Sequence, residues 1–344
     1  MSEKVAILIS APRGGGAEKS MRLVHSEFIK RQLDSLLVSI NGDSKTALEL
    51  GANEVNLGRS PRANLFETLS TILKFNVLIW KFRPRTLILN GEISELLGVF
   101  GLIPGCSLIV VEHANPSWEG RRVLGMLIRK ILCIRKSRYV AVSGHIKSPF
   151  PIHGYSAVIP NPIGDDISPD THVVGNRLER LVYIGRLATV HKNPELLLQI
   201  AREVRIPVVY FGEGELRHEL AEQANSLGVN VDFRGWVEEP WQELHPNDLL
   251  VIPSEHEGDG LVAVEAILRG VPVLMNNVED LTRFNLPKHN YCSSLNEFVE
   301  TINHNLFSPW ALISTRDSRV KLRESRNLSS VADHWLEFIS PSTI

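Results

Sequence analysis

Short apolar, β-branched runs alternate with helical patterns along almost the whole chain of 344 residues. This alternation is typical of parallel sheets with helices on both faces, because each strand reaches its parallel neighbour through a crossover helix. The runs expected to form strands are 4–10, 35–40, 86–89, 107–112, 138–142, 181–184, 207–211, 229–233, 248–252 and 271–274. Helical patterns lie between most of them, for example at 17–33, 64–82, 119–134, 215–227 and 261–269. The sequence therefore predicts an α/β protein with doubly wound, Rossmann-like sheets.

The alternation pauses once, at 159–166, where two prolines stiffen the backbone and a glycine lets it turn. We take this segment as the link between two domains, 1–160 and 161–325. A last helical pattern near 329–339 has apolar residues spaced for one buried face. We therefore expect a C-terminal helix, within 326–344, that packs back on the first domain.

The loop after the predicted strand 248–252 contains the most informative motif. Gly258 and Gly260 precede a helical pattern, and glycines before a helix start leave several amides and the positive end of the helix dipole open to an anion. Glu257 lies in this loop and Glu265 lies eight residues on, in the helix, so both carboxylates could bind sugar hydroxyls beside a bound phosphate. A solvated loop acid and a helix-stabilised glutamate would give the same pair, but the flanking strand and the following Gly-Val-Pro-Val favour a binding site.

Residues 257–266 resemble the E-x7-E signature of retaining glycosyltransferase family 4, whose members have the GT-B fold. Other segments resemble family segments in the expected order: 14–18 (glycine-rich loop), 159–162 (interdomain link), 183–187 with 192–194 (G-R-x…K-N), 211–214 (G-x-G) and 233–237 (base-binding F-x-G loop). The resemblance implies two Rossmann-like domains, with the acceptor bound by the first and a nucleotide sugar bound by the second.

The resemblance also implies the roles of individual residues. Donor binding would involve Gly15, Gly16, Arg186, Lys192, Gly212, Trp236, Val237, Glu257, Gly258, Gly260, Leu261 and Glu265. Catalysis would involve His113, Glu257, Arg186 and Lys192. The residue chemistry agrees at Arg186 and Lys192, because two cations in one loop can neutralise a diphosphate, although ordinary loop cations would look the same.

The strand 107–112 of the first domain ends in Glu112 and His113. By resemblance His113 contacts the donor sugar, whereas a lone histidine is more often structural. Glu112 fits a buried, hydrogen-bonded acid equally well. Asn115 and Trp118 follow closely and are candidates for shaping the acceptor pocket.

The expected function is a retaining glycosyltransferase that moves a hexose or N-acetylhexosamine from a nucleotide diphosphate sugar, by family a UDP-sugar, to a glycan or lipid-linked glycan. Synthesis of a bacterial-type surface polysaccharide or glycoconjugate is the expected setting. No dedicated carboxylate base is recognisable, which favours front-face transfer with the donor phosphate taking the acceptor proton. Two alternatives stay open: a nucleotide-sugar 2-epimerase of GT-B fold, and a non-catalytic nucleotide-sugar-binding subunit.

Metal and cofactor are not expected, because Arg186 and Lys192 can hold the phosphates and the sequence has no D-x-D motif. One residue departs from the family pattern: Asp259 stands between the two glycines, where an aromatic residue is common. A carboxylate there would repel a diphosphate unless it points elsewhere. The three cysteines have no metal-binding spacing, and we interpret them as core or incidental thiols.

Charge is unevenly distributed, with a balance of +9 over residues 1–160 and −11 over the remainder. The stretch 121–138 holds seven basic and no acidic residues, together with leucines and isoleucines at helical spacing. It fits either a basic amphipathic helix on an anionic membrane surface or a core helix with a solvated basic face. No nucleic-acid module is recognisable. The first run, 4–10, is too short for a signal-peptide core, so we expect a cytoplasmic protein, peripheral at the inner face of the plasma membrane if the first interpretation holds.

Overall fold

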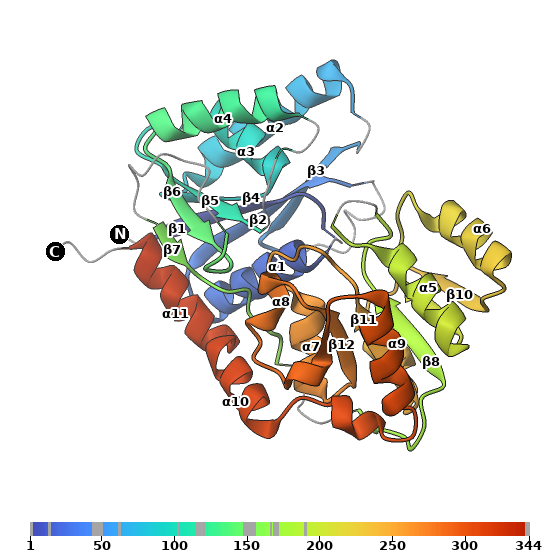
Figure 1. The fold of residues 1–344 in the computed structure, drawn as a ribbon. Helices are drawn as coiled ribbons and strands as arrows, with labels where there is room; N and C mark the ends of the chain where they lie inside the picture. The colour runs from blue at the N-terminus through green and yellow to red at the C-terminus, as the bar shows by residue number, and fades with distance from the viewer. Residues whose placement is uncertain are drawn as a thin grey trace. The chain divides into compact units, whose positions relative to one another are not determined.

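The computed structural model divides the chain into two compact units, residues 1–164 with 325–344, and residues 165–324 (Figure 1). The first unit ends at Gly164, four residues beyond the expected boundary. The residues that the structure describes are 3–12, 15–42, 51–60, 63–101, 103–113, 118, 121–146, 156–165, 167, 172–188 and 191–340.

The first unit is built on a seven-stranded sheet of order β3-β2-β1-β4-β5-β6-β7, and every pair in it is parallel. Its elements are β1 (Lys4–Ile9), α1 (Gly16–Lys30), β2 (Asp34–Asn41), β3 (Glu54–Arg59), α2 (Leu65–Phe82), β4 (Thr86–Asn90), α3 (Glu92–Phe100), β5 (Ser107–Glu112), α4 (Arg122–Ile134), β6 (Arg138–Ala141), β7 (Ser156–Val158) and α11 (Leu328–Ile339).

The two faces of this sheet bury different helices. Val5, Ile7 and Ile9 of β1 share one core with α1 and α11, whereas Ala6 and Leu8 share the other core with α2, α3 and α4. Alternate residues of a strand point to opposite faces, so a strand buried on both faces has to be apolar throughout. Figure 1 shows the same layers, with α2, α3 and α4 on one side of the sheet and α1 and α11 on the other.

Helix α11 explains the late helical pattern of the sequence. Its residues Val331, Trp335 and Phe338 are buried in the core that α1 lines. Arg31, which follows α1, forms an ion pair with Asp333 of α11. The last turn of α11 is held by Arg138, whose guanidinium donates to the carbonyl oxygens of Phe338 and Ile339. The end of the chain is thereby part of the first unit.

The second unit is built on a six-stranded sheet of order β10-β9-β8-β11-β12-β13, again with every pair parallel. Its elements are β8 (Arg180–Ile184), α5 (Pro194–Val204), β9 (Val208–Phe211), α6 (Arg217–Leu227), β10 (Val231–Gly235), β11 (Asp248–Ile252), α7 (Leu261–Arg269), β12 (Val273–Asn276), α8 (Glu279–Thr282), β13 (Tyr291–Cys292), α9 (Leu295–His304) and α10 (Arg316–Ser325), with short 3-10 helices at Pro240–Glu243, Lys288–Asn290 and Pro309–Leu312. Helices α5, α6 and α9 cover one face, and α7 covers the other.

The predicted α/β class is confirmed, and every strand that the sequence predicted is present with ends shifted by at most two residues. Strands β3, β7 and β13 were missed, and each lies at an edge of its sheet. Among the described residues, no helix is long and apolar enough to cross a bilayer. The three cysteines are free thiols, and burial raises the pKa of Cys106 and of Cys292 to about 11, so these two stay protonated at neutral pH.

Candidate functional site

Five of the twelve predicted donor-binding residues lie in two loops that leave the carboxyl ends of neighbouring strands, β8 and β11. From β8 the chain proceeds through β9 to β10, whereas from β11 it proceeds the other way through β12 to β13. The two loops therefore diverge where the strand order reverses, which is the place where open α/β sheets bind ligands. The β8 loop carries Arg186 and Lys192, and the β11 loop carries Glu257, Gly258 and Gly260.

Helix α7 begins directly after a left-handed glycine, because Gly260 has φ 58° and ψ 42°. A Cβ at this position would also approach the ring of Phe284 to 3.3 Å, so the loop requires glycine here. The first amides of the helix, from Leu261 onward, have no acceptor within the helix and carry the positive end of its dipole. A helix start of this kind can bind a phosphate through backbone hydrogen bonds.

An ion pair joins the two loops: Nζ of Lys192 lies 2.6 Å from Oε1 of Glu257. The backbone amide of Glu257 donates to Oδ2 of Asp280 at 2.9 Å, which holds the β11 loop against α8. The structure thus brings two predicted site residues into contact and adds Asp280, which motif reasoning missed. The side chain of Lys192 remains 31% exposed, so an anionic ligand can reach its ammonium group.

Arg186 and Glu265 differ strongly in exposure. The side chain of Arg186 is exposed and forms no ion pair with a described acidic residue, while the hydroxyl of Tyr183 anchors its backbone by donating to its carbonyl oxygen at 2.8 Å. Glu265 lies within α7, where residues 263–269 are all buried, and is 9% exposed. A ligand hydroxyl could reach the Glu265 carboxylate only through this small opening.

Asp259 is held by a partner that the sequence analysis did not foresee. Its Oδ1 lies 3.4 Å from the guanidinium of Arg283, and its side chain is only 4% exposed. The same guanidinium donates to the carbonyl oxygen of Gly258 at 3.5 Å. The carboxylate that departs from the family pattern is therefore paired with a cation, which offsets the repulsion that it would exert on a diphosphate.

Gly212 follows β9 where the backbones of neighbouring loops come very close. A Cβ there would lie 1.8 Å from the carbonyl oxygen of Gly185, and its amide donates to the carbonyl oxygen of Gly235 at 2.7 Å. This close approach explains the glycine without a ligand. Trp236, just after β10, is half-exposed, and Val237 packs against the core beneath α7.

The candidates of the first unit lie at the corresponding edge of their own sheet. Gly15 is the N-cap of α1 and Gly16 is its first residue, both exposed, directly after β1. His113 follows β5, and its Nε2 is hydrogen-bonded to Oδ1 of Asn90, the buried last residue of β4. Asn90 was missed by sequence reasoning, although a polar residue that ends an apolar run before a glycine is a usable signal. It fixes the orientation of the His113 ring.

Glu112 is a structural acid rather than a ligand-facing one. The guanidinium of Arg129 donates to Glu112 at 2.6 Å and also pairs with Glu95 at 3.1 Å, and all three side chains are largely buried. Trp118 is buried, and its indole N–H donates to Glu95 at 2.9 Å, so the structure gives it a packing role. Asn115 lies outside the described residues.

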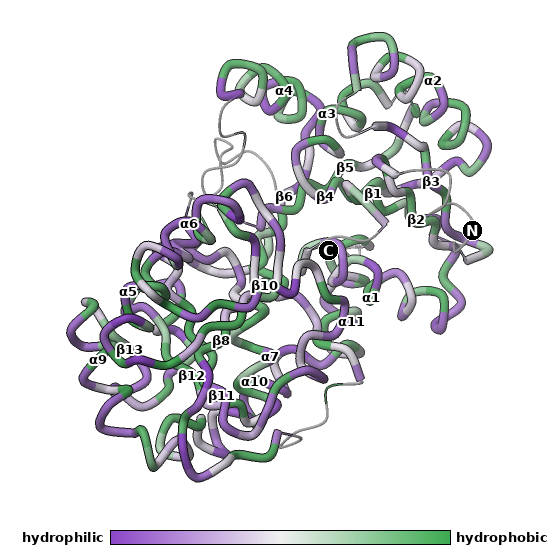
Figure 2. The backbone as a smooth tube through the Cα atoms, turned by 90° about the vertical axis from the view of Figure 1, so that its right-hand side faces the viewer, coloured by the Kyte–Doolittle hydropathy of each residue, from purple (hydrophilic) through white to green (hydrophobic). Residues whose placement is uncertain are grey.

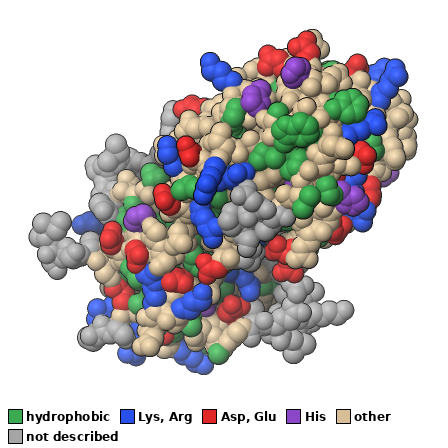
Figure 3. Space-filling view, turned by 90° about the horizontal axis from the view of Figure 1, so that it is seen from below, with side chains coloured by type: hydrophobic (Ala, Val, Ile, Leu, Met, Phe, Trp, Pro, Cys, Tyr) green, Lys and Arg blue, Asp and Glu red, His purple; other side chains and the backbone are tan. Residues whose placement is uncertain are grey.

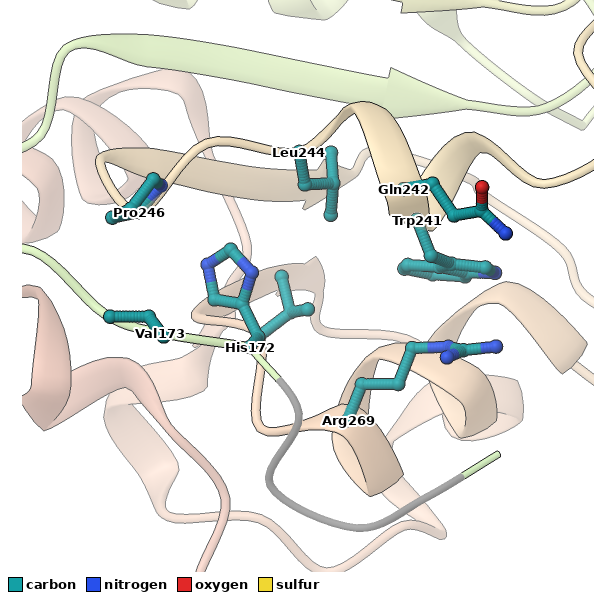
Figure 4. A pocket seen from close by; sticks show the side chains of 8 residues that line it. His172, Val173, Trp241, Gln242, Leu244, Pro246 and Arg269 are labelled. Carbon is teal, nitrogen blue, oxygen red and sulfur yellow. The ribbon is translucent and has the colours of Figure 1, made fainter. Parts of the chain in front are cut away.

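A separate pocket of about 340 Å³ lies at the opposite end of α7, near the amino ends of β11 and β12 (Figure 4). Arg269, in the last turn of α7, stacks over Trp241 at 5.5 Å, and its carbonyl oxygen accepts the amide of His172. Burial lowers the pKa of His172. Because Gly260 starts the same helix and Arg269 ends it, this pocket does not coincide with the candidate site.

Residues 179–302 match the family model described as Glycosyl transferases group 1. An uncharacterized glycosyltransferase of Methanocaldococcus jannaschii is 33% identical over 109 residues, which are 29% of this chain and 28% of that protein. A Campylobacter jejuni α-1,4-N-acetyl-D-galactosaminyltransferase, whose name gives a diphospho-undecaprenol-linked acceptor, is 25% identical over 77% of this chain and 76% of its own. The chain spans 28% to 32% of the length of the first curated relatives that it matches.

A solved structure, Anabaena HepE in complex with UDP and glucose, superposes with a TM-score of 0.80 at 18% identity, covering 98% of this chain and 100% of that chain. With the two parallel sheets, this likeness establishes the GT-B fold. The match to the group 1 family model lies within the second unit, and all candidate residues of that unit lie within the matched segment.

Proposed function

We propose that this GT-B protein is a retaining glycosyltransferase that moves a hexosyl or N-acetylhexosaminyl group from a UDP-sugar to a glycan or lipid-linked glycan, in the synthesis of a surface polysaccharide or glycoconjugate. The observation that carries the proposal is the start of helix α7 after Gly260. The ion pair of Lys192 with Glu257 holds a cation against the same loop. The relative that transfers N-acetylgalactosamine and the neighbour that holds UDP and glucose support the choice of substrates.

In the proposed reaction, the bond between the anomeric carbon and the donor phosphate oxygen breaks while the acceptor oxygen bonds to the same carbon on the same face. The acceptor proton passes to the leaving phosphate oxygen. The chain's task is then to stabilise the diphosphate charge, which Lys192, Arg186 and the amides from Leu261 onward would do electrostatically. Glu257 would turn from Lys192 to the sugar hydroxyls, and Glu265 would hold the ribose.

The first unit is proposed to bind the acceptor, with His113 contacting the transferred sugar and Gly15 and Gly16 admitting a ligand close to the start of α1. The basic stretch 121–138 is proposed to make peripheral contact with a membrane at the cytoplasmic face. Three arginines of this stretch already have partners within the protein. Arg129 donates to the buried Glu112, and Arg135 and Arg138 donate to carbonyl oxygens at the ends of α3 and α11. The remaining cations are the ones available for this contact.

A thermal-shift screen of nucleotide sugars, followed by NMR of the product anomeric proton, tests the proposal. A UDP-sugar should stabilise the protein, and the product should keep the donor's anomeric configuration. An inverted product would refute the retaining mechanism. Turnover of the donor to an epimer without any acceptor would instead identify an epimerase, and binding without turnover on any acceptor would identify a non-catalytic subunit.

A further inference from the structure

Helix α2 is apolar on two opposite faces, and only one of them is covered. Its inner face contributes Phe75 and Ile79 to the core of the first unit. Its outer face carries exposed apolar side chains at Phe66, Leu69, Leu73, Val77 and Trp80. These positions are spaced by three or four residues, so they form one continuous stripe along the helix. The exposure is large: 80% for Phe66, 69% for Leu73 and 53% for Trp80.

Helix α4 repeats this arrangement. Ile128 and Leu132 face the core, whereas the other apolar side chains of the helix are exposed, namely Val123, Leu124, Met126, Leu127, Ile131 and Ile134. The interpretation of 121–138 as a core helix with a solvated basic face therefore holds only for the residues of α4 that face the core. Helices α2 and α4 together hold twelve of the twenty large hydrophobic side chains exposed among the described residues. The exposed apolar surface is thus concentrated rather than scattered.

The two stripes belong to one layer. Helix α3 contacts both α2 and α4, and all three helices lie on the same side of the sheet in Figures 1 and 2. Figure 2 shows hydrophobic and hydrophilic segments alternating along α2 and α4. Phe100, at the end of α3, is also exposed and lies in the same layer. We call the outward side of α2 and α4 the helical outer face.

The charges on the helical outer face are almost all positive. Exposed lysines and arginines lie on or beside the two helices, at Lys81, Arg83, Arg85, Arg121, Arg122, Lys130 and Lys136, whereas the ammonium of Lys74 donates to the carbonyl oxygen of Leu57 in β3. Glu67, in the first turn of α2, is the one acidic residue within the two helices, and α4 has none. The view from below in Figure 3, which looks from the side opposite α2 and α4, shows acidic and basic side chains interspersed. The side seen in Figure 3 therefore does not share the predominantly positive charge of the helical outer face.

We propose that the helical outer face is a membrane-binding surface that docks flat on an anionic lipid bilayer, with the α2 stripe inserted among the acyl chains and the cations of both helices paired with lipid phosphates. Helices with an apolar stripe and flanking lysines and arginines bind in this way, and an exposed tryptophan is suited to the interface. Each cation near an anionic surface adds to the attraction. The proposal adds α2 to the stretch 121–138 and does not depend on the proposed reaction.

A bilayer fits this face better than a second copy of the chain. A symmetric dimer through the helical outer face would bring the cations of one copy against the same cations of the other, with Glu67 as the sole acidic counterpart on these helices. Like charges brought together at an interface oppose association. Anionic headgroups instead supply the missing negative charge across the whole face.

Flotation of the full chain with lipid vesicles tests the proposal without donor or acceptor. We expect binding to vesicles of phosphatidylcholine with phosphatidylglycerol and little binding to phosphatidylcholine alone. Replacing Phe66 and Leu73 together with serine should lower the partition coefficient at least about 100-fold, because two apolar side chains no longer enter the bilayer. Replacing Arg122 and Lys130 together with glutamine should lower it about 30-fold. The matched control replaces Phe307 and Val320, exposed apolar residues of the second unit, with serine and should bind as the unaltered protein does.

Trp80 offers an independent readout of depth. Lipids brominated in their acyl chains should quench part of the tryptophan fluorescence, and Trp80→Phe should abolish this quenching. Trp310→Phe is the control, because Trp310 of the second unit is equally exposed, at 54% against 53%. Absence of flotation with anionic vesicles, flotation unchanged by the Phe66 and Leu73 substitutions, or quenching that survives Trp80→Phe would each overturn the proposal. So would a dimer, detected by light scattering, that the same substitutions dissociate, because the face would then bind a second copy.

Glycosyl transfer to a soluble acceptor without vesicles keeps this test separate from the proposed function. The helical outer face variants should transfer sugar to a soluble acceptor at the unaltered rate, because their substitutions lie on the outer side of α2 and α4 and not at the carboxyl edge of either sheet. Vesicle binding without any transferase activity would support the membrane-binding surface and contradict the proposed function. Transferase activity without vesicle binding would support the proposed function and contradict the membrane-binding surface.

Discussion

The carboxyl edges of the two sheets share a topology but differ in chemistry. The strand order reverses between β1 and β4 in the first unit and between β8 and β11 in the second. The first edge presents two glycines at the start of α1 and a histidine bonded to an amide, His113 with Asn90. The second edge presents ion pairs, Lys192 with Glu257 and Arg283 with Asp259. Under the proposed function, the first edge would meet hydroxyl groups and the second edge a charged diphosphate.

The ion pair between Lys192 and Glu257 at the second edge bears on how a ligand would bind there. Lys192 and Glu257 neutralise each other in this ion pair, so a diphosphate would have to compete with Glu257 for the ammonium group. A carboxylate that loses its cation in a half-buried site must find another partner. Sugar hydroxyls can supply that partner. A nucleotide sugar could therefore replace the ion pair, with its diphosphate bound to Lys192 and its sugar bound to Glu257. A nucleotide without a sugar could bind Lys192 but would leave Glu257 without a new partner.

The largest effect is expected for Lys192→Ala. The substitution removes a cation from the diphosphate and leaves Glu257 without this partner, so kcat/KM should fall about 1000-fold. Steady-state kinetics with the nucleotide sugar found by the thermal-shift screen measures this, and calorimetry with UDP should report weaker binding. Lys192→Arg keeps the charge and should retain activity within about tenfold. If Lys192→Ala turned over within about threefold of the unaltered protein, the second edge would not be the charged half of the site.

His113→Ala tests the first edge in the same way. The histidine is expected to act on the sugar, so kcat should fall about 100-fold while the affinity for UDP stays within about twofold. Asn90→Ala acts through His113 as a positioning change and should lower kcat about tenfold, with a shifted pH profile of kcat because the imidazole loses its amide partner. Weakened UDP binding in either variant would contradict the assignment of separate tasks to the two edges.

Arg283→Ala should act on stability before it acts on turnover. It leaves the 4%-exposed Asp259 carboxylate without the guanidinium, which should cost about 2 kcal/mol of unfolding free energy. Asp259→Asn in the same background should restore much of this loss, because the uncompensated charge is gone. Urea unfolding of the single and double variants forms a double-mutant cycle. Additive losses would mean that the two side chains are not coupled.

The fold was largely predictable because buried parallel strands are apolar on both faces and are bounded by turn residues. The strands that were missed, β3, β7 and β13, are all edge strands, which have a neighbour on one side only. Strand β3 reads Glu-Val-Asn-Leu-Gly-Arg, a mixed pattern that its single neighbour β2 suffices to hold. Strand β13 has two residues, too few for any periodicity. Edge strands thus carry the weakest signal in this sequence.

The site was predictable where a residue's type is dictated by the backbone and less so where it depends on a distant partner. Gly260 and Gly212 need a conformation or a close approach that excludes a side chain, and the sequence analysis singled out both, although their role in donor binding stays a prediction. Asp280 and Arg283 both follow β12 and reach the site only through the fold, so no local pattern marks them, whereas Asn90 ends an apolar run before a glycine and could have been found from that signal. The face of α2 was missed for another reason: its inner and outer stripes are both apolar, and a sequence pattern does not tell which one is covered.

The smallest effect is expected from acidification, and it concerns the first unit. His25 of α1 is buried, bonded to Ser35 of β2, and burial together with the charge of Arg22 lowers its pKa to about 4. The pKa of His25 is higher in the unfolded state, at about 6.5, than in the folded state. Neutral His25 therefore contributes its full stability to the fold above about pH 6.5, and this contribution is lost as the pH falls toward 4. Between pH 7.5 and 5.5 the loss should be about 1 kcal/mol, and His25→Gln should remove this part of the pH slope. Hydrogen exchange of the α1 amides, followed as a function of pH, measures this loss of stability. The control is His218→Gln, because His218 lies on the exposed side of α6. An unchanged slope in His25→Gln would place the acid sensitivity elsewhere.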